Sequence, residues 1–170
     1  MAEESSAKWE GKAMVELAGT DAESVWPAIE DFCNIHKWIP IDTSYRVEGI
    51  PGQPGLIRYC AAAVKGGDSG GDAQTVTPTV NWAKEKLLTI DPLQRSLSYQ
   101  VLDNNLGFKS YVATVRVFPI NEDPKLGCKI EWGFVCDPVE GFTLQALQYL
   151  VESYVQSLAK KIELARSVTA

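Results

Sequence analysis

Two oppositely charged residues fall on the apolar faces of predicted strands. Side chains alternate between the two faces of a strand, so residues two apart point the same way. Arg58 is in phase with Leu56 and Cys60, and Glu85 is in phase with Leu87. An unpaired buried charge is costly, so both groups must pair, meet water or line a cavity if they point inward. A guanidinium and a carboxylate in one cavity could polarise a small substrate and move a proton.

Two tyrosines also lie on apolar strand faces. Tyr99 is in phase with Leu97 and Val101, and Tyr111 is in phase with Ala113. Their phenol groups could orient a substrate, or could fill the core with a satisfied hydroxyl. A β-bulge would shift the phase of a strand and turn its charged residue to solvent. From the strand pattern alone, both interpretations stay open.

Other constellations of reactive residues are weaker. His36 is the only histidine, too few for a histidine-based metal site, and a Ser-His-Asp triad would have to recruit it. The glycine-rich segments 49–55 and 65–72 lack the Gly-Lys-Ser/Thr ending of a P-loop and the spacing of a dinucleotide fingerprint. No Cys-X-X-Cys pair occurs, and reduced, partly buried thiols are expected at Cys33, Cys60, Cys128 and Cys136. We therefore expect neither a metal nor a cofactor.

The elements that must position these residues form an α+β pattern. A strand at 8–17 precedes two short helices, one carrying Val25, Trp26, Ile29 and Phe32 and the other at 34–39 before Pro40. Short β-rich runs follow at 41–48, 56–64, 76–87, 88–91, 96–103, 108–120 and 128–137. Their close spacing predicts an antiparallel meander.

A long amphipathic helix is predicted at residues 142–166. Its apolar positions recur in steps of three and four and include Leu147, Val151 and Tyr154. Such an apolar face is expected to pack against a sheet, and the middle of the helix could also form one wall of a pocket. The predicted fold class is therefore α+β, with a curved sheet that grips its C-terminal helix.

Length and charge limit the domain organisation and the partners. The chain has 170 residues, of which 45% are hydrophobic. This size predicts one domain at 8–170 after a disordered start at 1–7. The formal net charge of -6 has the wrong sign for binding nucleic-acid phosphates or an anionic membrane. Without a membrane-length apolar stretch or a signal-peptide h-region, we expect a cytoplasmic monomer that neither binds nucleic acid nor inserts into a membrane.

Six segments form an ordered set: Lys-Trp-Glu-Gly-Lys at 8–12, the segment 26–37 from Trp26 through Asp-Phe-Cys-Asn-Ile-His-Lys, Gly-Leu-Ile-Arg-Tyr at 55–59, Trp-Ala-Lys-Glu-Lys-Leu at 82–87, Ser-Tyr at 98–99 and Tyr-Val-Ala-Thr at 111–114. Together they resemble the plant lachrymatory factor synthase family, within the polyketide cyclase/dehydrase and START-like superfamily. The resemblance implies the helix-grip fold of the major birch pollen allergen. That fold has a seven-stranded antiparallel sheet wrapped around a long C-terminal helix, two short helices after the first strand, and an internal cavity.

The resemblance also implies a reaction and a set of site residues. The family rearranges the small 1-propenesulfenic acid to propanethial S-oxide without a cofactor. Its key arginine and glutamate match Arg58 and Glu85, and two pocket tyrosines match Tyr99 and Tyr111. By this match Arg58 holds and polarises the substrate oxygen, while Glu85 moves the proton as base and then acid. Apolar substrate contacts are expected from Leu87, Phe108, Trp132, Phe134, Leu147 and Val151.

Two departures from the family pattern concern the pocket. Segment 104–110 replaces a bulkier, more acidic and aromatic stretch, and the loop at 66–72 is longer and richer in glycine. Two functions follow: a cofactor-free lyase or isomerase acting on a small reactive molecule, or a carrier or receptor for a hydrophobic plant metabolite such as a lipid, phenolic or hormone-like compound. The pairing of Arg58 with Glu85 favours the enzyme, since a lipid carrier has less need of a buried acid-base pair.

Overall fold

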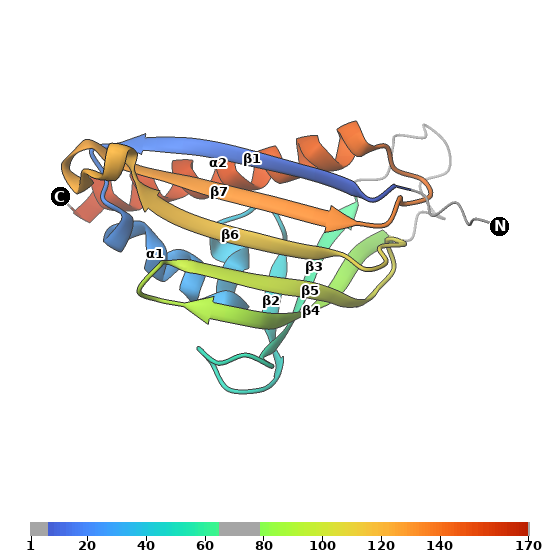
Figure 1. The fold of residues 1–170 in the computed structure, drawn as a ribbon. Coiled ribbons are helices and arrows are strands. Elements are labelled where there is room, and N and C mark those ends of the chain that lie inside the picture. Colours follow the sequence, from blue (N-terminus) through green and yellow to red (C-terminus); the bar gives the residue numbers. More distant parts are fainter. Residues whose placement is uncertain (1–6, 65–78, 170) are drawn as a thin grey trace, which may run out of the picture.

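The structure, a computed structural model, describes residues 7–64 and 79–169 (Figure 1). The expected disordered start, apart from Ala7, and the glycine-rich segment 65–72 lie outside these residues. The elements are β1 (Trp9–Ala18), α1 (Ala22–Glu30), the 3-10 helix η1 (Phe32–Lys37), β2 (Thr43–Glu48), β3 (Ile57–Val64), β4 (Thr79–Asp91), β5 (Ser96–Asn104), β6 (Val112–Pro119), the 3-10 turns η3 (Ile120–Glu122) and η4 (Pro124–Leu126), β7 (Gly127–Cys136) and α2 (Leu144–Thr169).

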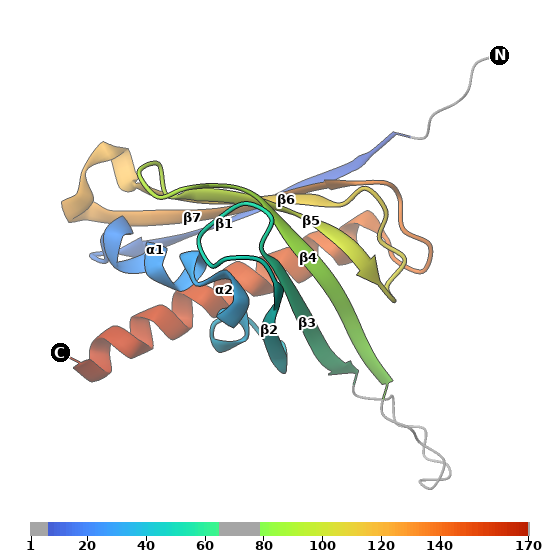
Figure 2. The ribbon, with the colours of Figure 1, turned by 90° about the horizontal axis from the view of Figure 1, so that it is seen from below.

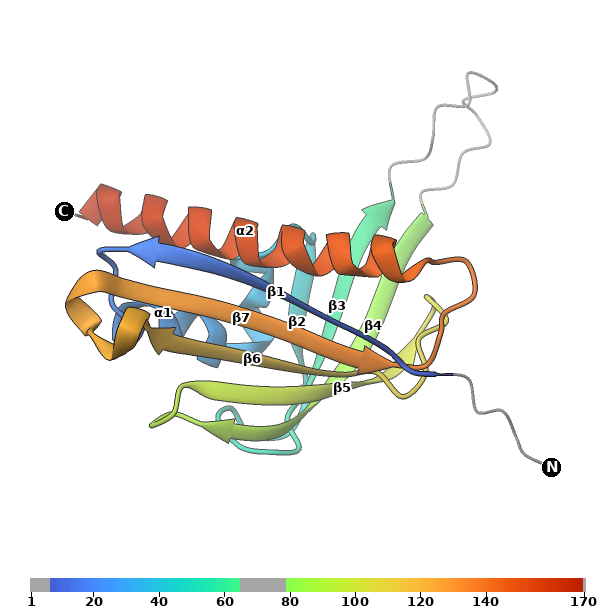
Figure 3. The same ribbon diagram turned by 45° about the horizontal axis from the view of Figure 1, so that its top comes forward.

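One antiparallel sheet contains the seven described strands, in the order β1-β7-β6-β5-β4-β3-β2. The sheet curves around α2, and Figures 2 and 3 show this helix running the length of the fold beside β1. Helix α2 also contacts the segment after η1, where the hydroxyl of Ser157 donates to the carbonyl of Trp38 at 2.9 Å. The predicted α+β class is confirmed, with an antiparallel sheet wrapped around the C-terminal helix.

Two short helices follow β1, with boundaries that differ from the prediction. The sequence places Phe32 on the first helix, but α1 ends at Glu30 because Asp31 leaves helical geometry with ψ at 66°. Asn34 then donates its side-chain amide to both carboxylate oxygens of Asp31 at 3.0 Å. The second helix is therefore a 3-10 helix at Phe32–Lys37 in place of the expected 34–39.

Several strand boundaries also differ from the prediction. The described part of the run 76–87, from Thr79, and the run 88–91 form one strand, β4, which continues through two register shifts against β5. Residues 76–78 lie outside the described part of the chain. Strand β6 begins at Val112 instead of residue 108, because the side chain of Asn104 ties the preceding loop by accepting N–H bonds from Leu106 and Phe108. Similarly, β2 begins at Thr43 instead of residue 41.

Helix α2 begins slightly later than predicted and is tied to the edge of the sheet. The hydroxyl of Thr143 accepts the N–H of Ala146 at 3.0 Å at the start of the helix. One turn on, the Gln148 side chain accepts the N–H of Lys12 at 3.1 Å and donates to the carbonyl of Lys12 at 2.9 Å. The neighbouring Gly11 has no room for a Cβ, which would clash with the Gln148 amide oxygen.

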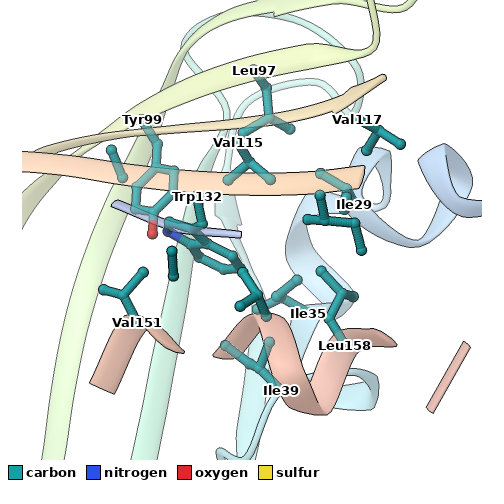
Figure 4. Close-up of a cluster of buried hydrophobic side chains, with 14 of the residues drawn as sticks. Ile29, Ile35, Ile39, Leu97, Tyr99, Val115, Val117, Trp132, Val151 and Leu158 are labelled. Carbon is teal, nitrogen blue, oxygen red and sulfur yellow. The ribbon is translucent and has the colours of Figure 1, made fainter. Parts of the chain in front are cut away.

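The core lies between the concave face of the sheet and α2 (Figure 4). The phases predicted for β5 and β7 are confirmed, since Leu97, Tyr99, Ile130 and Trp132 are all buried. In the two described ranges, no helix is both long and apolar enough to cross a membrane.

Candidate active site

Arg58 and Glu85 face each other on the inner side of the sheet, as their strand phases predict. They are direct partners in the antiparallel pairing of β3 with β4. Arg58 Nε donates to Glu85 Oε1 at 2.7 Å, and Nη2 lies 2.7 Å from the same oxygen. The side chain of Arg58 is 4% exposed and that of Glu85 is 14% exposed. The ion pair therefore compensates two charges that burial alone would make costly.

Further contacts hold the Arg58 guanidinium in place. Its Nη1 donates to the carbonyl of Phe32 at 2.8 Å. The guanidinium carbon lies 3.8 Å from the ring centroid of Phe32 and 4.7 Å from that of Tyr99, in cation-π geometry. Burial is the largest single influence and lowers the pKa of Arg58, but the negative charge of Glu85, the neighbouring Cys60 and Tyr99 and the hydrogen bond to Glu85 together outweigh it, so the pKa is raised. Arg58 thus stays a cation in its buried position.

A cavity of about 250 Å³ lies between the β3–β4 end of the sheet and α2. This is larger than the engineered cavity of about 150 Å³ that binds benzene and smaller than the roughly 300 to 1,000 Å³ of pockets for drug-sized ligands. Glu85 is the single acidic residue in the described cavity wall. Other members of the wall include Cys60, Phe108, Phe142, Leu150 and Tyr154. The cavity therefore suits a small, largely apolar molecule that meets one carboxylate.

Neither of the two predicted tyrosines is part of the described cavity wall. The ring centroid of Tyr99 is 5.8 Å from that of Phe32 and 6.5 Å from that of Trp132. Tyr111 stacks against Phe108, with ring centroids 4.9 Å apart. Burial raises the pKa of both phenols, so each stays neutral and keeps its O–H donor.

Of the other predicted contact residues, only Phe108 lies in the described wall of this cavity. The remaining five are buried in the core: Leu87, Trp132, Phe134, Leu147 and Val151. On α2 the wall is made instead by Leu150 and Tyr154. The apolar stripe of the helix is wide enough to contain both sets, and helical periodicity does not separate them.

Cys60 and Tyr154 line the cavity beside Glu85 but were not among the predicted site residues. The Cys60 thiol donates to Glu85 Oε1, with Sγ 3.8 Å from that oxygen. The ring of Tyr154 lies 5.3 Å from that of Trp132. Burial raises the pKa of both groups, and the charge of Glu85 raises each further. Cys60 could have been identified because it shares a strand face with Arg58. Tyr154 could have been identified because it is a residue with a hydroxyl group on the otherwise apolar face of the C-terminal helix.

His36 pairs with a serine, but not in the geometry that activates a nucleophile. Its Nδ1 lies 2.8 Å from the hydroxyl of Ser44, which itself donates to the carbonyl of Cys33 at 2.8 Å. The hydroxyl hydrogen is then committed to Cys33, which assigns Nδ1 as the donor. A serine nucleophile needs the opposite arrangement, with histidine accepting the proton. In the described ranges, no group of three or more His, Cys, Asp or Glu residues is placed to hold a metal ion.

A curved antiparallel sheet closed over its C-terminal helix, with a cavity at one end, defines a helix-grip protein. Residues 9–165 match the family model described as polyketide cyclase/dehydrase and lipid transport. The chain belongs to this family, whose description covers both enzymes and lipid-transport proteins.

Solved structures from bacteria share the fold. A Thermobifida fusca protein solved by NMR is 22% identical over 90% of this chain and 92% of that chain, with a TM-score of 0.66. An uncharacterised protein from Bacillus thuringiensis is 18% identical, and the match covers 90% of this chain and 98% of the Bacillus chain, with a TM-score of 0.66. A protein from Thermus thermophilus is 14% identical over 92% and 98%, with a TM-score of 0.68. At these identities the likeness shows the fold alone.

Proposed function

We propose that the protein is a cofactor-free lyase or isomerase, similar to lachrymatory factor synthase, that rearranges a small reactive molecule by proton transfer. The observation that carries this proposal is a buried, directly paired arginine and glutamate whose carboxylate lines a cavity of about 250 Å³. A buried, charge-paired residue at the wall of a cavity is a candidate for a functional site. The small cavity favours a compact substrate over a long lipid.

Glu85 is the proposed proton carrier. With 1-propenesulfenic acid, its carboxylate takes the proton from the S–O–H group and returns it to the second carbon of the propenyl chain. The C=C bond becomes a C=S bond in the same rearrangement, so atoms and electrons balance without a further reactant. A base that later acts as an acid in one turnover needs only one carboxylate.

Arg58 is proposed to act through Glu85. The resemblance implies that Arg58 holds the substrate oxygen, but its guanidinium donates to Glu85 and to Phe32, and it is not part of the described cavity wall. Fixing the carboxylate is the role that these contacts support. Tyr154, which lines the cavity, is the phenol best placed to donate to the substrate oxygen. Tyr111 stacks on the wall residue Phe108, and Tyr99 packs against the Arg58 guanidinium.

The test supplies purified protein with 1-propenesulfenic acid, generated in place by alliinase, and follows propanethial S-oxide by gas chromatography. We expect product above the enzyme-free background, and its loss in Glu85→Gln and Arg58→Leu. A matched control is Glu23→Gln, which removes the carboxylate of an equally short pair with Arg95 at the protein surface. Full turnover in a folded Glu85→Gln variant would exclude the proposed proton transfer.

The second candidate function is a carrier or receptor for a hydrophobic metabolite. It is favoured by the family description, which includes lipid transport, and by apolar wall residues such as Phe142 and Leu150. Native mass spectrometry of the purified protein separates the two functions. A stoichiometric co-purified lipid or phenolic supports the carrier, and absence of turnover by the folded protein after that ligand has been removed would favour the carrier over the enzyme.

A further inference from the structure

The two carboxylate oxygens of Glu85 have different surroundings. Oε1 accepts hydrogen bonds from Nε of Arg58 at 2.7 Å and from the thiol of Cys60 at 3.8 Å, and Nη2 of Arg58 makes an ion-pair contact with it at 2.7 Å. Within the described residues, Oε2 has no hydrogen-bond partner. A carboxylate oxygen can accept about two hydrogen bonds through its lone pairs, so these two donors leave Oε1 with no capacity for a ligand.

Cys60 reaches Oε1 because of its place on the sheet. It lies on β3, two residues after Arg58 and on the same face, and it pairs with Ala83 on β4. From there its side chain forms part of the cavity wall beside Glu85. Its thiol stays protonated, since burial and then the carboxylate charge raise its pKa. A protonated thiol beside a carboxylate is a hydrogen-bond donor and a poor nucleophile.

The phenols near this pair come from other elements. Tyr99 faces it from β5 and Tyr154 from α2, and both are neutral donors with raised pKa values. Among the hydrogen bonds of the described residues, neither phenol donates to the carboxylate of Glu85. The donors that fix Oε1 are therefore both supplied by β3, one charged and one neutral.

We propose that Cys60 is a positioning residue which, together with Arg58, saturates Oε1 of Glu85 and leaves Oε2 as the oxygen that exchanges a proton with the ligand. This inference rests on the proposed proton transfer by Glu85. It adds the identity of the reacting oxygen and a role for a thiol that the proposed chemistry does not otherwise use. Hydrogen bonds to one oxygen withdraw its charge, so the other oxygen remains the better proton acceptor.

The first test needs no substrate. The S–H stretching band of Cys60 is measured by infrared spectroscopy and assigned by its loss in Cys60→Ser. A thiol that donates to a charged carboxylate absorbs at lower frequency than one that donates to a neutral amide oxygen or has no acceptor, so we expect the band to move to higher frequency in Glu85→Gln. A matched control is Glu131→Gln, since Glu131 pairs with Lys12 and Arg116 away from the cavity. An unmoved band in a folded Glu85→Gln variant would overturn the hydrogen bond and with it the inference.

The second test compares crystal structures and turnover of Cys60→Ala and Cys60→Ser. We expect the Glu85 carboxylate to rotate in Cys60→Ala, and kcat on the alliinase-generated sulfenic acid to fall about threefold to tenfold, as for loss of one hydrogen bond of ordinary strength, since a thiol is a weak donor, with KM little changed. Cys60→Ser, which keeps a donor, should recover part of the rate. An unchanged carboxylate and unchanged kcat in Cys60→Ala would refute the positioning role. Absence of turnover in the unmodified protein would instead refute the proposed function, while the infrared and crystallographic results would still decide the contact.

Discussion

Replacing Glu85 by Gln should make the thiol of Cys60 much more reactive. The Sγ of Cys60 lies 3.8 Å from Oε1 of Glu85, and the carboxylate charge favours the thiol over the thiolate. At an effective dielectric constant of about 20, a unit charge at this distance contributes roughly 4 kcal/mol, or about a thousandfold in the thiol-thiolate equilibrium. A less basic thiolate is also a weaker nucleophile, and with a Brønsted coefficient of about 0.4 to 0.5 the net gain in rate is roughly 30- to 60-fold.

The assay is alkylation by iodoacetamide at fixed pH, with each cysteine followed by peptide mass spectrometry. Cys33 is an internal control, because burial raises its pKa while Glu85 is not among the causes. Cys128 is fully buried and reports global opening, so its rate shows whether the variant is simply less stable. A change of less than about twofold at Cys60, with Cys128 unchanged, would refute the electrostatic argument made from the Coulomb estimate.

Three further outcomes are expected. Arg58→Leu should lower the free energy of unfolding in urea by about 3 to 5 kcal/mol, because it leaves a buried carboxylate without its partner. Adding Glu85→Gln should restore part of that loss, and strictly additive effects of the two substitutions on stability would contradict the pairing. Asp21→Ala should cost about 1 kcal/mol at neutral pH through loss of the helix cap on the Ser24 N–H. That hydrogen bond lowers the pKa of Asp21. The stability that Asp21 contributes is therefore present above its unfolded-state pKa and is lost as the pH falls through its folded-state pKa. A stability difference between Asp21→Ala and the unmodified protein that persists at pH 2 would contradict the carboxylate cap. Phe108→Ala should widen the cavity and admit larger aromatic ligands in a thermal-shift screen, whereas an unaltered ligand preference would show that Phe108 does not limit its size.

The inward position of the charged pair could be predicted because strand phase is a local property. Arg58 and Glu85 each kept the face shared by their apolar neighbours, even though β4 shifts register against β5 on both sides of Glu85. Those shifts occur between β4 and β5, and the pairing of β3 with β4 stays continuous. The alternation of side chains on which the prediction rested is therefore unbroken at the pair of Arg58 and Glu85.

The cavity wall could not be predicted in the same way, because it depends on tertiary contacts. Phe108 was expected within a strand, but the Asn104 side chain replaces strand pairing with bonds to the loop backbone. Side chain-to-backbone bonds of this kind leave no periodic signal in the sequence. On α2, the rotation of the helix decides that Leu150 and Tyr154 face the cavity while Val151 faces the core. Leu150 and Val151 are both hydrophobic, so hydrophobicity does not indicate which of them faces the cavity.

The contact between Gln148 and Lys12 has a consequence for association between molecules. Strand β1 is an edge of the sheet, and an unpaired edge offers backbone groups to a strand from another chain. The Gln148 amide already uses the N–H and the carbonyl of Lys12, the two groups that an incoming strand would need there. Strand addition at this point would first have to displace α2, which also covers the core. Resistance to edge-to-edge aggregation is thereby coupled to the docking of the C-terminal helix, so a variant that loosens α2 would expose the core and a pairing site together.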